Sequence, residues 1–332
     1  MKIAFFDIQG WEKSHVRRAL KEHEVLFFAE PLSLETVDQV SDCEVVSVFI
    51  YSDVSDEVMA KMPSLHCVTT RSTGYDHIDL AAARKRKICV SSVPFYGENT
   101  VAEHTFALIL ALSRNVHTSH VRRLRGDFSI EGLCGFDLKG KTIGVVGAGH
   151  IGLNVIKIAR GFGMNVLAFD LHPDAFLAEV LDFSYASFDD VLEQSDIITL
   201  HVPYNKHTHH LISEENYVKF KRGSILINTA RGELVDNDAL ISALDEGILS
   251  GAGLDVLDGE DLIREERQLL HDPQKIEQLG ELIKDHILLS KDNVVFTPHI
   301  GFYSQEALER ILDTTIENVC AFCDGKPKNI VE

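Results

Sequence analysis

The chain has 332 residues, 45% of them apolar, which is enough to bury sizeable cores and indicates two domains. Acidic residues outnumber basic ones by 51 to 32, so the formal net charge is −19. A negative chain repels phosphate backbones and anionic lipid, and we therefore expect no nucleic-acid partner and no binding to a membrane surface.

The N-terminal sequence is not typical of a targeting segment. Asp7 interrupts its apolar run, unlike a signal peptide, and no stretch of the chain approaches the ~18 apolar residues of a transmembrane helix. The six cysteines are scattered, which favours reduced thiols over a disulfide framework. Cys320 and Cys323 form a C-x-x-C without a second pair at zinc spacing, so we interpret them as thiols on one helix face and predict no metal site. We expect a soluble, cytoplasmic protein.

Short apolar, β-branched segments alternate with amphipathic segments in the first part of the chain. The predicted strands are 2–7, 24–28, 45–50, 67–70 and 88–91. The predicted helices between them include 12–21, 56–61 and 78–85. Alternation of this kind is typical of βαβ units and a parallel sheet covered on both faces, and it predicts a small flavodoxin-like α/β domain.

A long helix is predicted from about 101 to 123. Its first half, Val101 to Leu112, is apolar nearly all round, and a helix without a solvent face needs a second surface to cover it. It could be a central core helix or lie in a subunit interface. We favour the interface, which predicts a homodimer.

The alternation repeats in the second part of the chain. Its predicted strands are 142–146, 165–169, 197–200, 224–228, 251–254 and 294–296. Its predicted helices include 151–162, 188–194, 214–220 and 238–246. Six strands with helices between them are typical of a doubly wound dinucleotide fold. Residues 258–292 form a charged segment with helical tendency at 262–270 and 275–284. The function of this segment stays open.

Two stretches, 93–100 and 297–304, combine Pro, Gly and polar residues at the end of a strand. If both cross between domains, the final helix (305–324) returns to the first one. The predicted fold is therefore α/β with two doubly wound parallel-sheet domains. Residues 1–99 and 300–332 would form a substrate (catalytic) domain, 100–299 an inserted dinucleotide domain, and the cleft between them the active site.

The segment Gly147-Ala148-Gly149-His150-Ile151-Gly152 has G-x-G-x-x-G spacing between a predicted strand and a predicted helix. Gly147 permits a tight turn, Gly149 lets the backbone approach a pyrophosphate, and Gly152 permits close helix–strand packing. The next predicted strand ends at Asp170, whose carboxylate would bind ribose hydroxyls and repel a 2′-phosphate. The pattern predicts NAD rather than NADP.

Arg231, Glu260 and His299 each follow a later strand of the same predicted sheet. Ligands of an open parallel sheet bind beyond the carboxyl ends of its strands, so the three could converge. A guanidinium can hold a carboxylate with two hydrogen bonds, an imidazole can transfer a proton, and a carboxylate can orient that imidazole. With a hydride from NADH this predicts reduction of a 2-oxo acid to a 2-hydroxy acid. Taken separately, Arg231 could form a surface ion pair, Glu260 could be a solvated acid, and His299 could cap the end of a strand.

Six motifs resemble the D-isomer-specific 2-hydroxyacid dehydrogenase family over essentially the whole chain. They are RSTGYDHID at 71–79, NTVAEH at 99–104, VGAGHIG at 146–152, HVP at 201–203, NTARG at 228–232 and TPH at 297–299. The resemblance implies a split substrate domain and a homodimer. It assigns substrate binding to Arg231, the paired carboxylate to Glu260 and the acid/base role to His299.

The resemblance also implies cofactor contacts, with Asp255 near the nicotinamide amide. These contacts carry over to His150, Ile151, Asp170, Val202, Pro203, Thr208, Thr229, Ala230 and Asp255. The loop Ser72-Thr73-Gly74 is similar to the family's carboxylate-binding backbone.

Within the family the chain looks most like the D-lactate dehydrogenases. The aromatic pair Phe302 and Tyr303 would wall a small apolar pocket, and Phe49 and Tyr96 match positions on the methyl side of the substrate. Phe49 stands where some members have tyrosine, which leaves the side-chain preference open. We therefore expect an NAD-dependent D-lactate dehydrogenase acting on pyruvate. The alternatives are a dehydrogenase for 2-oxoisocaproate or phenylpyruvate and, in a different class, a non-enzymatic NAD sensor similar to the C-terminal-binding-protein corepressors.

Overall fold

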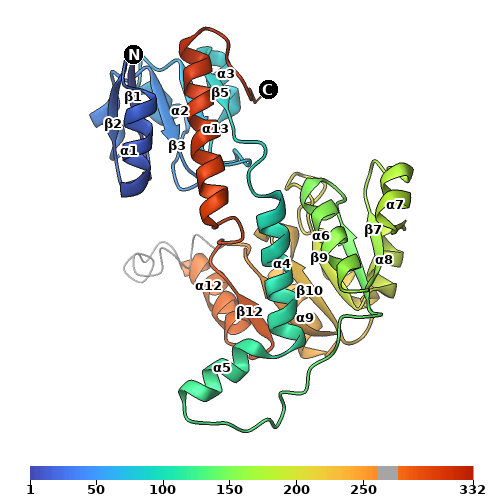
Figure 1. Ribbon diagram of the computed structural model, residues 1–332. Helices are drawn as coiled ribbons and strands as arrows, with labels where there is room; N and C mark the ends of the chain where they lie inside the picture. The colour runs from blue at the N-terminus through green and yellow to red at the C-terminus, as the bar shows by residue number, and fades with distance from the viewer. Residues whose placement is uncertain (260–275, 332) are drawn as a thin grey trace. The chain divides into compact units, whose positions relative to one another are not determined.

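The computed structural model describes residues 1–259 and 276–331 (Figure 1). The chain forms two compact units. Unit 1 comprises Met1–Tyr96 and Ser304–Glu332, and unit 2 comprises Gly97–Tyr303. Among the described residues, no helix has the length and apolar character needed to span a bilayer.

Unit 1 is built on a five-stranded parallel sheet. Its strands are β1 (Lys2–Phe5), β2 (Glu24–Phe27), β3 (Val45–Val48), β4 (Cys67–Thr70) and β5 (Cys89–Ser91). Their order, β2-β1-β3-β4-β5, is the flavodoxin-like order of a doubly wound sheet. Every residue of β3 and β4 is buried, as expected for central strands covered on both faces.

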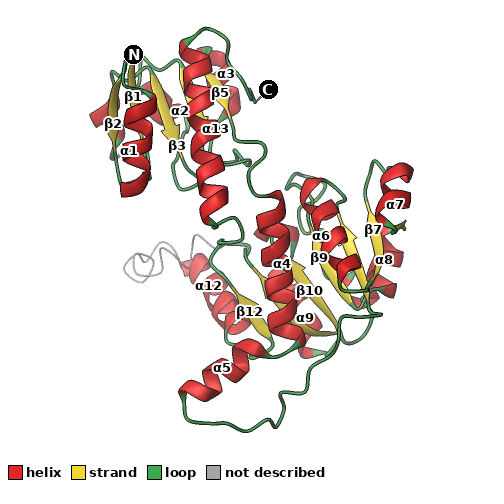
Figure 2. Cartoon of the chain, viewed as in Figure 1, coloured by secondary structure: helices red, strands yellow, loops and turns green. Residues whose placement is uncertain are grey.

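Helices cover both faces of this sheet (Figure 2). They are α1 (Gly10–Ala19), α2 (Asp56–Ala60), α3 (Leu80–Arg86), α13 (Gln305–Cys323) and the short 3-10 helix η1 (Val37–Val40). One core cluster joins Phe5 of the sheet to Val16 of α1 and Leu312 of α13, and a second joins Val46 to Val58 of α2. The C-terminal helix is therefore part of the core of unit 1.

Unit 2 is built on a seven-stranded parallel sheet. Its strands are β6 (Thr142–Val146), β7 (Asn165–Phe169), β8 (Ser184–Tyr185), β9 (Ile197–Leu200), β10 (Ser224–Asn228), β11 (Leu249–Leu254) and β12 (Val294–Phe296). The order β12-β11-β10-β9-β6-β7-β8 reverses between β6 and β9, the switch point at which such sheets bind dinucleotides. The predicted fold class is confirmed. β8 was not predicted because two residues carry no periodicity.

The helices of unit 2 enclose two core clusters, one on each face of the sheet. They are α4 (Glu98–Ser113), α5 (Val116–Leu124), α6 (His150–Gly161), α7 (Ala175–Leu181), α8 (Phe188–Gln194), α9 (Asn237–Asp245), α12 (Ile276–Leu289), and the 3-10 helices η2 (Tyr217–Lys219) and η3 (Gly232–Leu234). Both sheets thus have the two-faced cover that the alternating sequence predicted.

Two helix predictions were wrong. The single helix 101–123 is two helices, because Asn115 adopts a left-handed backbone with φ +50° and starts α5 in a new direction. The helix 214–220 is only the single turn η2. In addition, much of the apolar surface of α4 packs within unit 2 itself, on α6 and β11. The predicted helical tendency at 262–270 lies outside the described residues.

Candidate active site

One row of paired residues crosses six strands of unit 2 at the carboxyl edge of the sheet. The row runs through Phe169, Val146, Leu200, Asn228, Leu254 and Phe296. Neighbouring strands lie ~4.8 Å apart, so the residues that follow this row line a single edge. They are Asp170, Gly147, His201, Thr229, Asp255 and Thr297. The sheet therefore brings the glycine turn and the strand ends before Arg231 and His299 to the same edge, where parallel sheets bind ligands.

The glycine turn has the backbone that a dinucleotide site needs. Gly147 has φ +97°, and a Cβ there would lie 2.7 Å from the carbonyl oxygen of His201. A Cβ on Gly152 would collide with the carbonyl of Gly147, so α6 packs directly on the turn. A Cβ on Gly149 would meet nothing within 4 Å. The turn is closed toward the protein and open at Gly149, where a pyrophosphate would approach.

Asp170 is tied to the glycine turn. Its carboxylate accepts hydrogen bonds from the backbone N–H of Ala148 and of His172, both at 2.8 Å. No described side chain caps the N-terminus of α6 at Gly149, so the first-turn N–H groups remain available to an anion. The N–H donors at the helix N-terminus fit the pyrophosphate of a dinucleotide. The Asp170 carboxylate beside them is only partly buried and fits a free ribose 2′-hydroxyl.

The loop after β9 carries three further predicted cofactor residues, Val202, Pro203 and Thr208. The Thr208 hydroxyl donates to the Pro203 carbonyl and accepts from the Asn205 N–H, both at 2.8 Å, which closes the loop on itself. Before it, the His201 ring lies 2.9 Å from the Thr199 hydroxyl. Burial lowers the pKa of His201 to about 3, so this imidazole is neutral at physiological pH.

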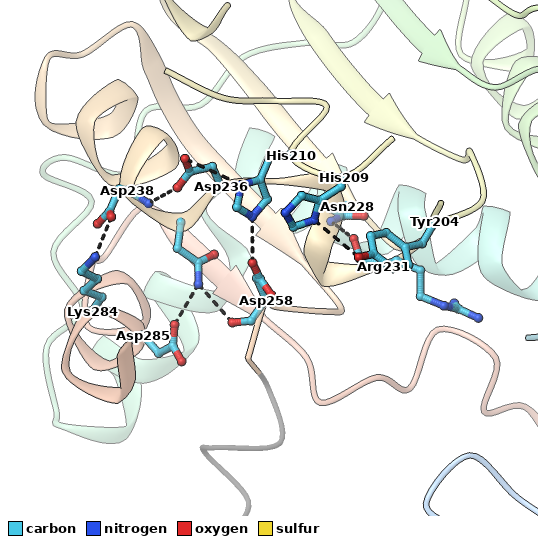
Figure 3. A network of polar contacts seen from close by, with 11 residues as sticks. Tyr204, His209, His210, Asn228, Arg231, Asp236, Asp238, Asp258, Lys284 and Asp285 are labelled. Atoms are coloured by element: carbon cyan, nitrogen blue, oxygen red, sulfur yellow. Dashed lines mark hydrogen bonds and ion pairs between the residues drawn. The ribbon is translucent and has the colours of Figure 1, made fainter. Parts of the chain in front are cut away.

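Arg231 follows β10 in a turn held by Asn228. The Asn228 side chain accepts from the Ala230 N–H at 3.0 Å and donates to the Arg231 carbonyl at 2.7 Å. The guanidinium is only partly buried, donates to the Ala230 carbonyl at 2.7 Å, and points away from the histidine pair drawn beside it (Figure 3). The preceding Thr229 hydroxyl lies 3.0 Å from that of Thr105 on α4. The backbone of the turn is thus fixed while its cation extends from it.

His299 lies in a turn that wraps around Asp255. Its backbone is left-handed, with φ +54°, and its N–H donates to the Asp255 carbonyl at 2.8 Å. The Asp255 carboxylate is 2% exposed and accepts from the Ile300 N–H at 2.9 Å and the Gly301 N–H at 2.7 Å. The Phe302 ring closes the turn, with its centroid 6.4 Å from that of His299 in an edge-on arrangement.

Two side chains complete the polar shell of Asp255. The Thr297 hydroxyl donates to its carboxylate at 2.6 Å, and Nε2 of His104 on α4 lies 3.3 Å from the same oxygen. Burial raises the pKa of Asp255, but the hydrogen bonds from His104, Thr297 and the turn outweigh it, so the pKa is below its usual value. Asp255 is therefore an ionised group that orders the His299 turn.

A second polar network fixes the end of the segment after β11 (Figure 3). Asp258 Oδ2 lies 3.0 Å from Nε2 of His210, whose ring stacks on His209 at 3.9 Å. The Asp258 carbonyl accepts from the Asn237 side chain at 3.1 Å. The chain is thus anchored two positions before Glu260, which itself lies outside the described residues.

The predicted substrate residues of unit 1 follow β3, β4 and β5 at the carboxyl edge of the other sheet. The Ser72 hydroxyl donates to the Gly74 carbonyl at 2.6 Å and the Thr73 hydroxyl to the Val93 carbonyl at 2.9 Å, so the loop is well ordered. Phe49 packs edge-on against Tyr51 at 5.7 Å. The Tyr96 carbonyl accepts from Arg310 Nε at 2.7 Å. These contacts are structural, and the substrate roles of the five residues Phe49, Ser72, Thr73, Gly74 and Tyr96 stay predictions.

Comparison with known proteins assigns the family. The profile described as "D-isomer specific 2-hydroxyacid dehydrogenase, NAD binding domain" matches residues 106–301. The D-lactate dehydrogenase of Escherichia coli (strain K12) is 33% identical and covers 96% of each chain. The chain belongs to the D-isomer specific 2-hydroxyacid dehydrogenase family. It is an NAD-dependent dehydrogenase, and all of the residues that match the NAD-binding profile lie in unit 2.

Solved structures of the family agree with this assignment. The D-lactate dehydrogenase from Aquifex aeolicus, complexed with NAD and lactic acid, has a TM-score of 0.87 at 37% identity and covers 98% of this chain and 96% of its own. A D-2-hydroxyisocaproate dehydrogenase has a TM-score of 0.85 at 30% identity, and the match covers 100% of this chain and 99% of its own. The similarity therefore extends to members named for acids of different size.

Sequence reasoning about this dehydrogenase did not single out His104, Thr297, His210 or Asp258 as parts of the site. His104 and Thr297, 193 positions apart, contact each other and the carboxylate of the predicted residue Asp255. His210 contacts the carboxylate of Asp258, two positions before the predicted Glu260. The available signal was that His104 and Thr297 both belong to motifs, NTVAEH and TPH, without an assigned role. Only the fold shows that they meet.

Proposed function

We propose that the protein is a D-lactate dehydrogenase that interconverts pyruvate and D-lactate. The observation that carries the proposal is the His299 turn, in which a buried carboxylate orders the backbone that carries the imidazole and the Phe302 ring lies edge-on to that imidazole. Phe302 is 8% exposed, so it is a fixed apolar wall rather than a mobile side chain. A proton donor beside such a wall suits a 2-oxo acid with a small apolar substituent.

The polar groups of the site have distinct roles in this proposal, and Asp255 has two, as a positioning residue and as a contact of NAD. NAD, when bound, supplies or accepts the hydride. Arg231 binds the substrate carboxylate through its planar fork, and His299 gives its proton to the carbonyl oxygen during reduction and takes it back during oxidation. Asp255 is a positioning residue, because its carboxylate is bonded to the His299 turn. Glu260 is proposed to pair with the imidazole, as its place in the family pattern implies.

The proposed cofactor residues are those of the carboxyl edge of unit 2. We assign contacts with NAD to Gly147, Gly149, His150, Ile151, Gly152, Asp170, Val202, Pro203, Thr208, Thr229, Ala230 and Asp255. In unit 1 we propose that Ser72, Thr73 and Gly74 bind the substrate carboxylate through the backbone, and that Phe49 and Tyr96 contact its side chain. Unit 1 would then be the substrate domain.

A bulkier 2-oxo acid is the second candidate, favoured by the full-length similarity to a D-2-hydroxyisocaproate dehydrogenase. The test is kcat/KM for NADH-dependent reduction of pyruvate, 2-oxobutyrate, 2-oxoisocaproate and phenylpyruvate. We expect roughly a tenfold or greater fall from pyruvate to 2-oxoisocaproate, since a branched chain would meet the Phe302 wall. A flat or rising profile would contradict the lactate assignment. Phe302→Ala is the matched variant, and it should flatten the profile by opening the wall.

We also propose that the protein is a homodimer. The support is an exposed apolar surface on α5 and the loop after it, where Leu124, Phe128 and Ile130 are 64%, 79% and 87% exposed. Side chains of this kind in one short segment are typical of a protein interface. Analytical ultracentrifugation should give twice the chain mass, and Phe128→Asp should shift the protein toward monomer. A wild-type monomer at micromolar concentration would contradict this proposal.

We propose a reducing compartment, the cytoplasm, as its location. All six cysteines are free, including the exposed Cys134. Free thiols at the surface are typical of proteins kept reduced by the cell.

A further inference from the structure

Two cysteines stand side by side in the sheet of unit 1. The register of β4 and β5 pairs Cys67 directly with Cys89. Paired residues of neighbouring parallel strands project to the same face, and their Cα atoms are ~4.8 Å apart. That separation falls within the roughly 4.4–6.8 Å range of disulfides, so the two sulfurs can be joined without moving either strand far.

The two thiols differ in their surroundings. Cys67 is buried, with 1% of its surface exposed, while Cys89 is half-buried and can be reached from solvent. The hydrogen bond between them lowers the pKa of Cys89 to about 7 and raises that of Cys67. Because the thiolate is the reactive form of cysteine, Cys89 is the nucleophile of the pair and Cys67 its protonated partner.

We propose that Cys89 and Cys67 form an oxidisable thiol pair that reacts with a hydroperoxide and closes to a disulfide. In the first step the Cys89 sulfur attacks one oxygen of the hydroperoxide. An S–O bond forms to the terminal oxygen and the O–O bond breaks. The leaving alkoxide, or hydroxide when the oxidant is hydrogen peroxide, takes up a proton to become an alcohol or water. In the second step the Cys67 sulfur attacks the Cys89 sulfenic acid, and hydroxide leaves with the Cys67 proton as water. Two thiols are oxidised by two electrons and the hydroperoxide is reduced by two.

The position of the pair separates it from the proposed substrate loop of unit 1. Cys67 and Cys89 are the first residues of their strands, at the amino edge of the sheet. Ser72 follows Cys67 by five positions, ~16 Å along an extended chain. A disulfide at the amino edge therefore leaves the Ser72-Thr73-Gly74 loop in place, and the proposal does not rest on the substrate of the enzyme.

Two other cysteines could compete for the oxidised sulfur. Cys320 and Cys323 of α13 pack on the same core cluster as Cys67 and Cys89. Burial raises the pKa of both, so they remain thiols at neutral pH. Neither is paired with Cys89 in the sheet, and we expect Cys67, its register partner, to capture the Cys89 sulfenic acid first.

The test is non-reducing peptide mapping of the full-length protein after treatment with one equivalent of hydrogen peroxide at about pH 7.5, where the lowered pKa of Cys89 favours its thiolate. We expect a Cys67–Cys89 linked peptide that is lighter by two hydrogens than the sum of its parts. Thiol loss should be roughly tenfold slower in Cys89→Ser, because the thiolate is lost. Cys67→Ser should instead trap a sulfenic acid at Cys89, detected as a dimedone adduct. The matched control is Cys134→Ser, which removes an exposed cysteine and should leave the linked peptide and its rate unchanged.

Three results would overturn the proposal. They are a wild-type disulfide that includes Cys320 or Cys323, oxidation of Cys134 at least as fast as that of Cys89, and no linked peptide after peroxide is consumed. The wild-type map distinguishes these results without any substitution, so the test still decides if the Cys67→Ser protein folds poorly. Circular dichroism of each variant verifies its fold.

Discussion

Two arginines follow parallel strands in this protein, and their side chains have different environments and different roles. Arg71 comes directly after β4 in unit 1, is 2% exposed, and donates to the Phe6 and Asp7 carbonyls at 2.6 and 3.1 Å. Arg231 comes three residues after β10 in unit 2 and is only partly buried, on a turn fixed by Asn228. Burial lowers the pKa of Arg71. Arg71 therefore joins strand ends of its own sheet, while Arg231 presents a cation at the edge of the other.

The difference shows what makes a strand-end residue available to a ligand. At Arg71 the side chain itself makes the bonds that order the edge. At Arg231 a neighbour, Asn228, orders the backbone with two hydrogen bonds, and the guanidinium adds one bond to the Ala230 carbonyl. The same arrangement recurs at His299, where Asp255 holds the turn. Removing a side chain should therefore affect stability at Arg71 and catalysis at Arg231 and His299.

His299→Asn should have the largest effect on activity. Loss of a proton donor costs on the order of 10²–10⁴ in rate, and asparagine keeps the size and tolerates the left-handed φ of the turn. We expect kcat with pyruvate to fall by that factor while the Kd for NADH changes less than about threefold. Steady-state kinetics and NADH fluorescence titration give the two numbers. The exposed His66→Asn is the control, and a kcat for His299→Asn within about tenfold of wild type would remove His299 from its role.

Replacing each arginine by methionine tests the comparison directly. Arg231→Met should raise KM for pyruvate by roughly 10–100-fold, since hydrogen bonds to a charged group contribute about 1.5–3 kcal/mol. It should lower the free energy of unfolding by about 1 kcal/mol or less, because only the hydrogen bond to the Ala230 carbonyl is part of the turn. Arg71→Met should lower that free energy by roughly 2–5 kcal/mol, because the buried Phe6 carbonyl and the part-buried Asp7 carbonyl lose their donor. Its KM should stay within a few-fold.

The measurements are pyruvate saturation curves and urea unfolding of both variants. Arg231→Lys is a third probe, and it should also raise KM because a point charge does not reproduce the planar fork. If Arg71→Met raised KM as strongly as Arg231→Met at unchanged stability, the distinction between the two arginines would be wrong.

Asp255→Asn should have an intermediate effect. One oxygen of the carboxylate becomes an NH2 group, so one of the two N–H groups, that of Ile300 at Oδ1 or that of Gly301 at Oδ2, loses its acceptor. A buried donor without an acceptor costs about 1–3 kcal/mol, so the His299 turn should loosen. We expect kcat to fall by roughly ten- to a hundredfold, with KM for pyruvate nearly constant. Thr297→Val removes only one bond to the carboxylate and should show a smaller loss in the same direction. A change in KM alone would assign Asp255 to binding instead.

The fold could be predicted from the sequence because its signals are local. Strand β4 has the same bounds in the structure as in the prediction, and the glycine turn lies between the strand and helix that its spacing requires. The break at Asn115 could not be predicted, since neither proline nor glycine interrupts residues 101–123. The Asp255 shell could not be predicted either, because His104 comes from a helix 151 positions earlier and packs there only through the tertiary fold. Periodicity reports which face of an element is buried, not which side chain it meets.

The smallest expected effect concerns His201, at the same edge of unit 2. Its folded pKa of about 3 lies below the ordinary value of 6.5, because burial disfavours the charged ring. The unfolded chain therefore binds a proton between pH 6.5 and 3 that the folded protein does not. This contribution to stability is complete above about pH 6.5 and is lost as the pH falls, by at most about 1.4 kcal/mol per pH unit. His201→Gln, which does not titrate, should show a shallower fall in urea unfolding free energy between about pH 7 and 5, whereas the exposed His66→Gln should match wild type. Equal slopes in wild type and His201→Gln would mean that the ring is hydrated in the folded protein and charges at its usual pH.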